Sequence, residues 1–108
     1  MRNCNNVIAI AQATIQPDGG EQVALGYFLC QHTGPEGEIL YGLRVDKRHL
    51  EGGLIEREET PPLTGSLADA TAMAEAFAKG TVPPCVLLEM VDEWYSQFFP
   101  SGIHAAGE

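Results

Sequence analysis

Hydrophobic residues in the first half of the chain recur at every second position, which predicts β-strands. The run at 7–15 is rich in β-branched residues, and the run at 22–31 is apolar on both faces, as expected of a central strand. Strict alternation at 39–46 predicts the clearest strand, and 54–59 follows as a charged strand suited to a sheet edge. Turns rich in Gly and Pro separate the runs, and the polar stretch 46–53 is expected to be a loop or hairpin tip.

The second half of the chain changes to helical spacing. Ser66, with Asp69 three residues later, predicts the start of a helix that ends at Lys79–Gly80. A second helix is expected from near Pro83–Pro84, and the stripe that it would bury consists of Leu87, Leu88, Val91 and either Trp94 or Tyr95. The order of elements predicts an α+β fold, in which an antiparallel sheet of about four strands is followed by two C-terminal helices packed on one face.

The length of 108 residues fits one domain, 1–108, whose ends at 1–6 and 100–108 are expected to fray. Its charge is lopsided, because 15 acidic residues against 6 basic ones give a net charge of −9. Phosphate groups are bound by clustered Lys and Arg, so we expect neither a nucleic acid nor an anionic membrane surface as a direct partner.

The cysteines and the hydropathy profile bear on location. Cys4, Cys30 and Cys85 are odd in number and lack the spacing of a zinc ribbon or a redox pair. The apolar run at 7–11 is too short for a signal peptide, and no stretch approaches the ~20 apolar residues that span a bilayer. These features predict a protein of the reducing cytoplasm.

The stretch from 22 to 98 resembles a family of short bacterial proteins from Gram-positive anaerobes that is known only as a domain of unknown function. The residues that carry the resemblance are Tyr41–Gly42–Leu43–Arg44–Val45, the strand at 54–59, the helix at 67–77, Val82–Pro83–Pro84, and the run at 87–94. The resemblance implies a small cytosolic bacterial protein, and it brings no catalytic residues with it.

Catalytic, cofactor-binding and metal-binding residues are not assigned, because no pattern supports them. His32, His49 and His104 are scattered, and we interpret them as surface or loop residues. Glu89, Asp92 and Glu93 share one helix face opposite the apolar stripe. We interpret them as solvent-exposed surface carboxylates without a catalytic role.

Cys85 falls in the first turn of the second helix, where the helix dipole favours a thiolate. A nucleophilic cysteine also needs a base, and no histidine is close to it in sequence. We therefore interpret Cys85 as a buried small hydrophobe and expect it to be unreactive.

The aromatic group at the end of the second helix is the candidate partner surface. Its four side chains crowd about one and a half turns and cannot all face one sheet: Trp94, Tyr95, Phe98 and Phe99. The leading hypothesis is a non-enzymatic protein-binding or regulatory module, with a homodimer as one form. One alternative is a small ligand-binding domain or enzyme that uses Cys85 or a His in a sheet–helix cleft, and another is an acidic nucleic-acid mimic.

Overall fold

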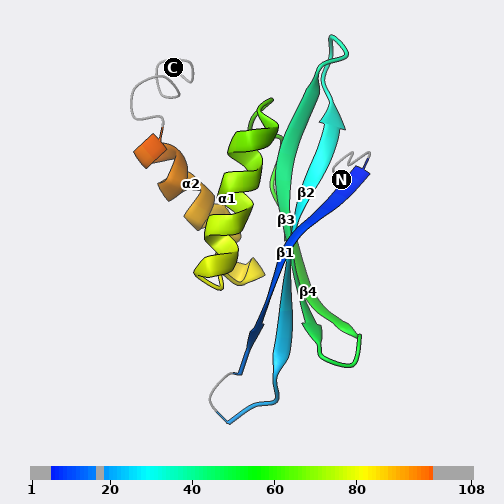
Figure 1. The fold of residues 1–108 in the computed structure, drawn as a ribbon, viewed down its shortest axis with the longest axis vertical. Helices are drawn as coiled ribbons and strands as arrows, with labels where there is room; N and C mark the ends of the chain where they lie inside the picture. The colour runs from blue at the N-terminus through cyan, green and yellow to red at the C-terminus, as the bar shows by residue number, and fades with distance from the viewer. Residues whose placement is uncertain (1–5, 17–18, 99–108) are drawn as a thin grey trace.

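The computed structural model describes residues 6–16 and 19–98, and residues 95–98 are described by their backbone only. Four strands are followed by helices, which confirms the predicted α+β fold (Figure 1). The elements are β1 (Asn6–Ile15), β2 (Val23–Thr33), β3 (Ile39–His49), β4 (Leu54–Glu59), α1 (Leu67–Lys79), the short 3₁₀ helix η1 (Pro84–Val86) and α2 (Leu87–Phe98). The residues predicted to fray lie outside the described part, apart from Asn6, which begins β1.

The sheet is a meander in which each strand pairs antiparallel with the next one along the chain, in the order β1-β2-β3-β4. Strands β2 and β3 occupy the centre and pair from Val23↔His49 to Thr33↔Ile39. The predicted loop at 46–53 is therefore wrong for 46–49, which belong to β3. Only the four residues between β3 and β4 form the turn, where Gly52 has φ 122° and the His49 N–H donates to the Gly53 carbonyl at 2.8 Å.

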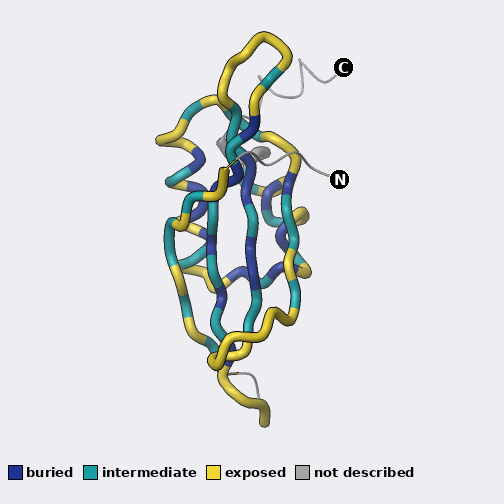
Figure 2. The backbone as a smooth tube through the Cα atoms, turned by 90° about the vertical axis from the view of Figure 1, so that its right-hand side faces the viewer, coloured by how far each residue is buried: buried dark blue, intermediate teal, exposed yellow. Residues whose placement is uncertain are grey.

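Both helices cover the same face of the sheet, so the opposite face carries no helix (Figure 1). Figure 2 looks onto the sheet from the side of this helix-free face and shows the middle strands more buried than the hairpin tips. The core lies between sheet and helices and includes Leu25, Tyr27, Leu29, Leu43, Val45, Met73, Phe77, Leu87 and Val91.

Tyr27 ties the centre of the sheet to the connection between α1 and η1. Its phenol oxygen donates a hydrogen bond to the Val82 carbonyl at 2.8 Å. Burial disfavours the charged phenolate and raises the pKa of Tyr27 to about 12. The phenol is therefore a neutral, structural donor over the ordinary pH range.

The predicted helix boundaries hold for α1 and shift for α2. Ser66 caps α1, because its Oγ accepts from the Asp69 N–H at 3.1 Å. The second helical segment opens with a 3₁₀ turn, and regular α-helix begins at Leu87. Leu88 was expected on the buried stripe, but it is 45% exposed. Spacings of three and four residues from Leu87 select Met90, Val91 and Trp94, and Leu88 turns away from them.

No helix in the described ranges is long and apolar enough to cross a membrane.

Candidate functional site

The β1 edge of the sheet is long and uncharged. Its ten residues, NVIAIAQATI, include neither a charged side chain nor a proline. A bulge between Ala9 and Ala11 interrupts the pairing with β2, and the Asn6 Oδ1 accepts from the Val7 N–H at 3.1 Å near the start of the strand. From Ala11 to Ile15 the ladder is regular. This stretch therefore presents an outer row of backbone groups without the devices that usually block a sheet edge.

The β4 edge is short and charged. Four of its six residues, Glu56–Glu59, carry a charge. The chain after β4 stays against β3, because the Thr60 N–H donates to the Leu43 carbonyl at 2.9 Å and Thr64 bridges to Tyr41. Charge and a short strand are two of the features by which native proteins discourage strand addition at an edge.

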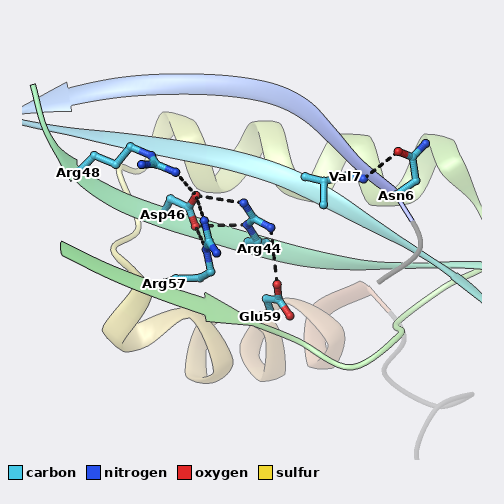
Figure 3. A network of polar contacts seen from close by, with 7 residues as sticks. All are labelled: Asn6, Val7, Arg44, Asp46, Arg48, Arg57 and Glu59. Carbon is cyan, nitrogen blue, oxygen red and sulfur yellow. Dashed lines mark hydrogen bonds and ion pairs between the residues drawn. The ribbon is translucent and has the colours of Figure 1, made fainter. Parts of the chain in front are cut away.

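Next to the β4 edge, the helix-free face carries a cluster of three arginines around Asp46 (Figure 3). Arg57 donates to both Asp46 oxygens, at 2.8 and 3.1 Å, and Arg44 does so at 3.3 and 3.4 Å. Arg48 adds a contact to Asp46 Oδ2 at 3.4 Å and a hydrogen bond to the Gly52 carbonyl. We call Arg44, Asp46, Arg48 and Arg57 the arginine cluster.

The pKa of Asp46 reflects two opposing influences. Burial of the carboxyl, which is 1% exposed, raises the pKa. Hydrogen bonds from Arg57 and Arg44, together with their positive charges, outweigh burial and hold the pKa below the ordinary value of 3.8. Asp46 is therefore ionised at neutral pH and binds the three guanidinium groups as an anion.

The cluster concentrates positive charge in a negative protein. Half of the six Lys and Arg residues of the chain lie here, beside two carboxylates, Asp46 and Glu59. Three positive and two negative groups leave a local surplus of one positive charge, while the whole chain has a net charge of −9. Arg44, Asp46 and Arg48 occupy alternate positions of β3, so their side chains lie on one face of the sheet. The sequence contains this alternation, but the prediction of a loop at 46–53 separated Arg48 from Arg44.

The candidate partner surface is only partly within the described residues. Trp94 is half-buried, and its ring packs against Phe77 with 5.8 Å between centroids. It lines an apolar groove of about 500 Å³ between α1 and α2, together with Val82, Met90 and Glu93. The side chains of Tyr95 and Phe98 and the whole of Phe99 lie outside the described part, so their role as a partner surface stays a prediction.

The burial predicted for two potentially reactive residues, Cys85 and His32, is wrong. Cys85 is exposed in η1 rather than buried, because a 3₁₀ turn replaces the first turn of the expected helix. His32 is not a surface residue: it is 6% exposed in β2, beside Leu40, Pro61 and Pro62 around a cavity of about 320 Å³. Sequence reasoning had no local signal for this burial, since the covering prolines come from a distant segment.

The remaining candidate side chains that the structure describes are exposed on the surface. His49 is exposed, and its Nδ1 lies 2.7 Å from Glu21 Oε2. Glu89, Asp92 and Glu93 are exposed, as expected. His104 lies outside the described residues, and among those described no group of three or more His, Cys, Asp or Glu side chains is arranged to hold a metal ion.

The structure does not bring Cys85 and His32 to one site. His32 alternates along β2 with the core residue Leu29 and so points to the helix-free face, whereas Cys85 belongs to the helical layer. The Nε2 of His32 is buried and has no hydrogen-bond partner among the described residues. A sheet–helix cleft containing both side chains is therefore not formed.

A protein-family model described as "Family of unknown function (DUF6514)" matches residues 6–97. The match confirms the resemblance to a domain of unknown function and extends it to include β1. Comparison with curated proteins and with solved structures gives no significant match.

Proposed function

We propose, on the premise that the chain belongs to the DUF6514 family of unknown function, that this is a protein-binding module that pairs with another strand at its β1 edge. We propose a second copy of the chain as the partner. The observation that supports this is the contrast between the uncharged β1 and the short, charged β4. Strand addition of this kind takes its affinity from main-chain hydrogen bonds and its specificity from alternate side chains.

The regular segment Ala11–Ile15 is the proposed pairing stretch. It avoids both the bulge at Ala9/Ala11 and the amide that Asn6 occupies. Centred on Ala13, an antiparallel pair would bring Gln12 of one copy opposite Thr14 of the other, and both side chains are exposed on the helix-free face. A two-fold axis through this centre makes the contact self-complementary, as in most homodimers.

Pairing at β1 would join two sheets of four strands into one continuous sheet. A two-fold axis perpendicular to the sheet keeps both pairs of helices on one side and both arginine clusters on the other. Because β1 carries no charge, the pairing juxtaposes no like charges despite the net charge of −9. The arrangement also removes the one edge that the fold leaves without charge.

A charge-swap experiment tests the pairing. We expect the Gln12→Lys, Thr14→Lys variant and the Gln12→Glu, Thr14→Glu variant each to be monomeric, since like charges would face each other across the pair. Mixing the two variants should restore a dimer, because Lys would then face Glu. Sedimentation velocity over a range of concentrations measures all four samples, including the wild type.

The matched control is Ala68→Lys, Ala72→Lys, which adds the same charge at exposed positions of α1 and should leave the dimer intact. A wild type that stays monomeric at every accessible concentration contradicts self-association at β1. Variants that dimerise as well as the wild type place the contact elsewhere. The aromatic positions at the end of α2 would then be the next surface to test, through Phe99→Ala.

The proposal also includes the compartment. We place the module in the bacterial cytoplasm, on the support of its cysteine pattern and of the family resemblance. Fractionation of a native host, followed by immunoblotting, tests this placement.

A further inference from the structure

The arginine cluster on the helix-free face has more hydrogen-bond donors than its own carboxylate can use. Asp46 receives five contacts: Oδ1 from Arg44 and Arg57, and Oδ2 from Arg44, Arg48 and Arg57. An ionised carboxyl group offers about four lone-pair sites, so Asp46 is saturated. Each guanidinium carries five N–H donors, and those not directed at Asp46, the Gly52 carbonyl or Glu59 remain for another acceptor.

The guanidinium groups are held in place before any ligand arrives. Asp46 anchors Arg44 and Arg57 through two contacts each, and the Phe28 ring lies 5.2 Å from the Arg44 guanidinium carbon. Arg48 is held between Asp46 and the Gly52 carbonyl. Side chains that are already ordered lose less conformational entropy when they bind, which favours affinity.

The cluster is also accessible. The side chains of Arg48 and Arg57 are 40% and 36% exposed, although Asp46 beneath them is 1% exposed. Both helices lie on the other side of the sheet, so nothing in the helical layer covers these arginines (Figures 1 and 3). An incoming anion would meet guanidinium groups before it met the buried carboxylate.

We propose that the arginine cluster binds an acidic peptide segment of another protein, in extended form with carboxylates at alternate positions. The Nη2 atoms of Arg44 and Arg48 each lie 3.4 Å from Asp46 Oδ2, so these two nitrogens are no more than about 7 Å apart. Acidic residues at every second position of an extended segment are also about 7 Å apart, so neighbouring carboxylates match this separation. Carboxylates match the planar fork of arginine, and the local surplus of positive charge attracts them to this face of a negative protein.

Calorimetric titration with a blocked peptide of alternating Glu and Ser tests the proposal, with a Gln–Ser peptide of the same length as the uncharged comparison. The wild-type protein should bind the Glu–Ser peptide and not the Gln–Ser peptide, and added NaCl should weaken the binding. Arg48→Gln should weaken it at least about tenfold, since one charge-assisted contact is lost. Lys79→Gln makes the same change in net charge on α1, away from the cluster, and should bind like the wild type.

A far-ultraviolet circular dichroism melt on each variant shows whether it is folded at the titration temperature. Arg57→Gln removes the closest partner of Asp46, so Arg48, the most exposed of the three, provides the primary variant. Equal affinity of wild type and folded Arg48→Gln overturns the proposal, as does the absence of wild-type binding. Tighter binding of a single-stranded oligonucleotide than of the Glu–Ser peptide also overturns it, because the face would then be a phosphate site. None of these outcomes depends on the pairing at β1.

Discussion

The two edges of the sheet are made from opposite kinds of residue. β1 is ten residues long and uncharged, whereas β4 has six residues, four of them charged. The central strands between them have the same length of 11 residues and bury the same core. Charge and a short strand protect the β4 edge from pairing, whereas β1 has neither feature and contributes apolar side chains to the core.

The β4 side is held by a network of charged side chains, whereas the residues of β1, Asn6–Ile15, carry no charge. Asp46 and its arginines join β3 to β4, and Thr60 continues the ladder beyond Glu59. On the β1 side, partly buried Ile8, Ile10 and Ile15 pack against the core. The comparison predicts that removing one polar group will damage the β4 side more than adding a charge will damage the exposed face of β1.

The largest expected effect comes from Asp46→Asn. The amide cannot neutralise three guanidinium groups, so we expect a loss of about 2–3 kcal/mol in the free energy of unfolding. Urea denaturation at neutral pH measures it. A loss below about 0.5 kcal/mol, the usual range for an ordinary surface position, would contradict the structural role of the cluster.

The pH dependence of that loss provides its own check. The pKa of Asp46 is lowered in the folded state, so its contribution is present above the unfolded value of 3.8 and is lost as pH falls through the lower, folded pKa. The difference in stability between wild type and Asp46→Asn should therefore shrink as the pH is lowered below 3.8. A constant difference in that range would mean that the carboxylate charge is not responsible.

Gly42→Ala should have the next largest effect. A Cβ at this position would meet the Pro61 carbonyl oxygen at 2.8 Å and the Thr60 carbonyl oxygen at 3.0 Å, and this backbone cannot turn aside as a side chain can. We expect the free energy of unfolding to fall by about 1–3 kcal/mol, and thermal melts measure this change. Gly26→Ala is the matched control, because the three atoms nearest to its Cβ all belong to the Phe28 side chain rather than to the backbone. Equal losses in the two variants would contradict close packing of 60–61 over β3.

Tyr27→Phe tests the centre of the sheet, which lies between the two edges. We expect the free energy of unfolding to fall by about 1–2 kcal/mol, because the buried Val82 carbonyl loses its hydrogen-bond donor. The pKa of Tyr27 is raised from 10.0 to about 12, so its contribution is complete below pH 10 and is lost as pH rises toward 12. The wild type should therefore lose stability over that interval, and Tyr27→Phe should lose less. Parallel pH profiles would contradict this assignment.

The smallest change in stability is expected for Thr14→Lys and Ile55→Lys, one on each edge. Both positions are exposed, so each free energy of unfolding should change by no more than about 0.5 kcal/mol. Their effects on association should differ, because only Thr14 lies in the proposed pairing stretch. Equal weakening of the dimer by the two variants would remove the distinction between the edges.

Local patterns in the sequence predicted most of the fold. Alternation identified four strands, and Ser66 marked the start of α1. Alternation failed after Val45, because the remainder of β3 carries charged and polar side chains on both faces and resembles a loop. The burial of His32 and the exposure of Cys85 depend on long-range packing and on a 3₁₀ turn, which local periodicity does not contain.

The candidate surfaces were less predictable than the fold. Sequence reasoning placed the partner surface on the aromatic residues of α2, and it gave β1 no functional meaning. The contrast between β1 and β4 needs the strand order, because only that order makes them the two edges. The arginine cluster needs the pairing Asp46↔Arg57, which joins residues from two strands. The acidic nucleic-acid mimic stays a prediction that rests on net charge alone.

The sheet order follows the chain order, and this has a consequence for synthesis on the ribosome. Each strand can pair with the one before it as it emerges, whereas the helices that cover the core face are made after all four strands. At about 5–20 residues per second, Phe98 follows Glu59 out of the ribosome about 2–8 s later. During that interval a nascent sheet exposes the apolar side chains of Leu25, Leu29 and Leu43 beside its uncharged edge. If the chain pairs with a second copy at β1 as we propose, neighbouring chains on one messenger RNA would meet there while each is still incomplete.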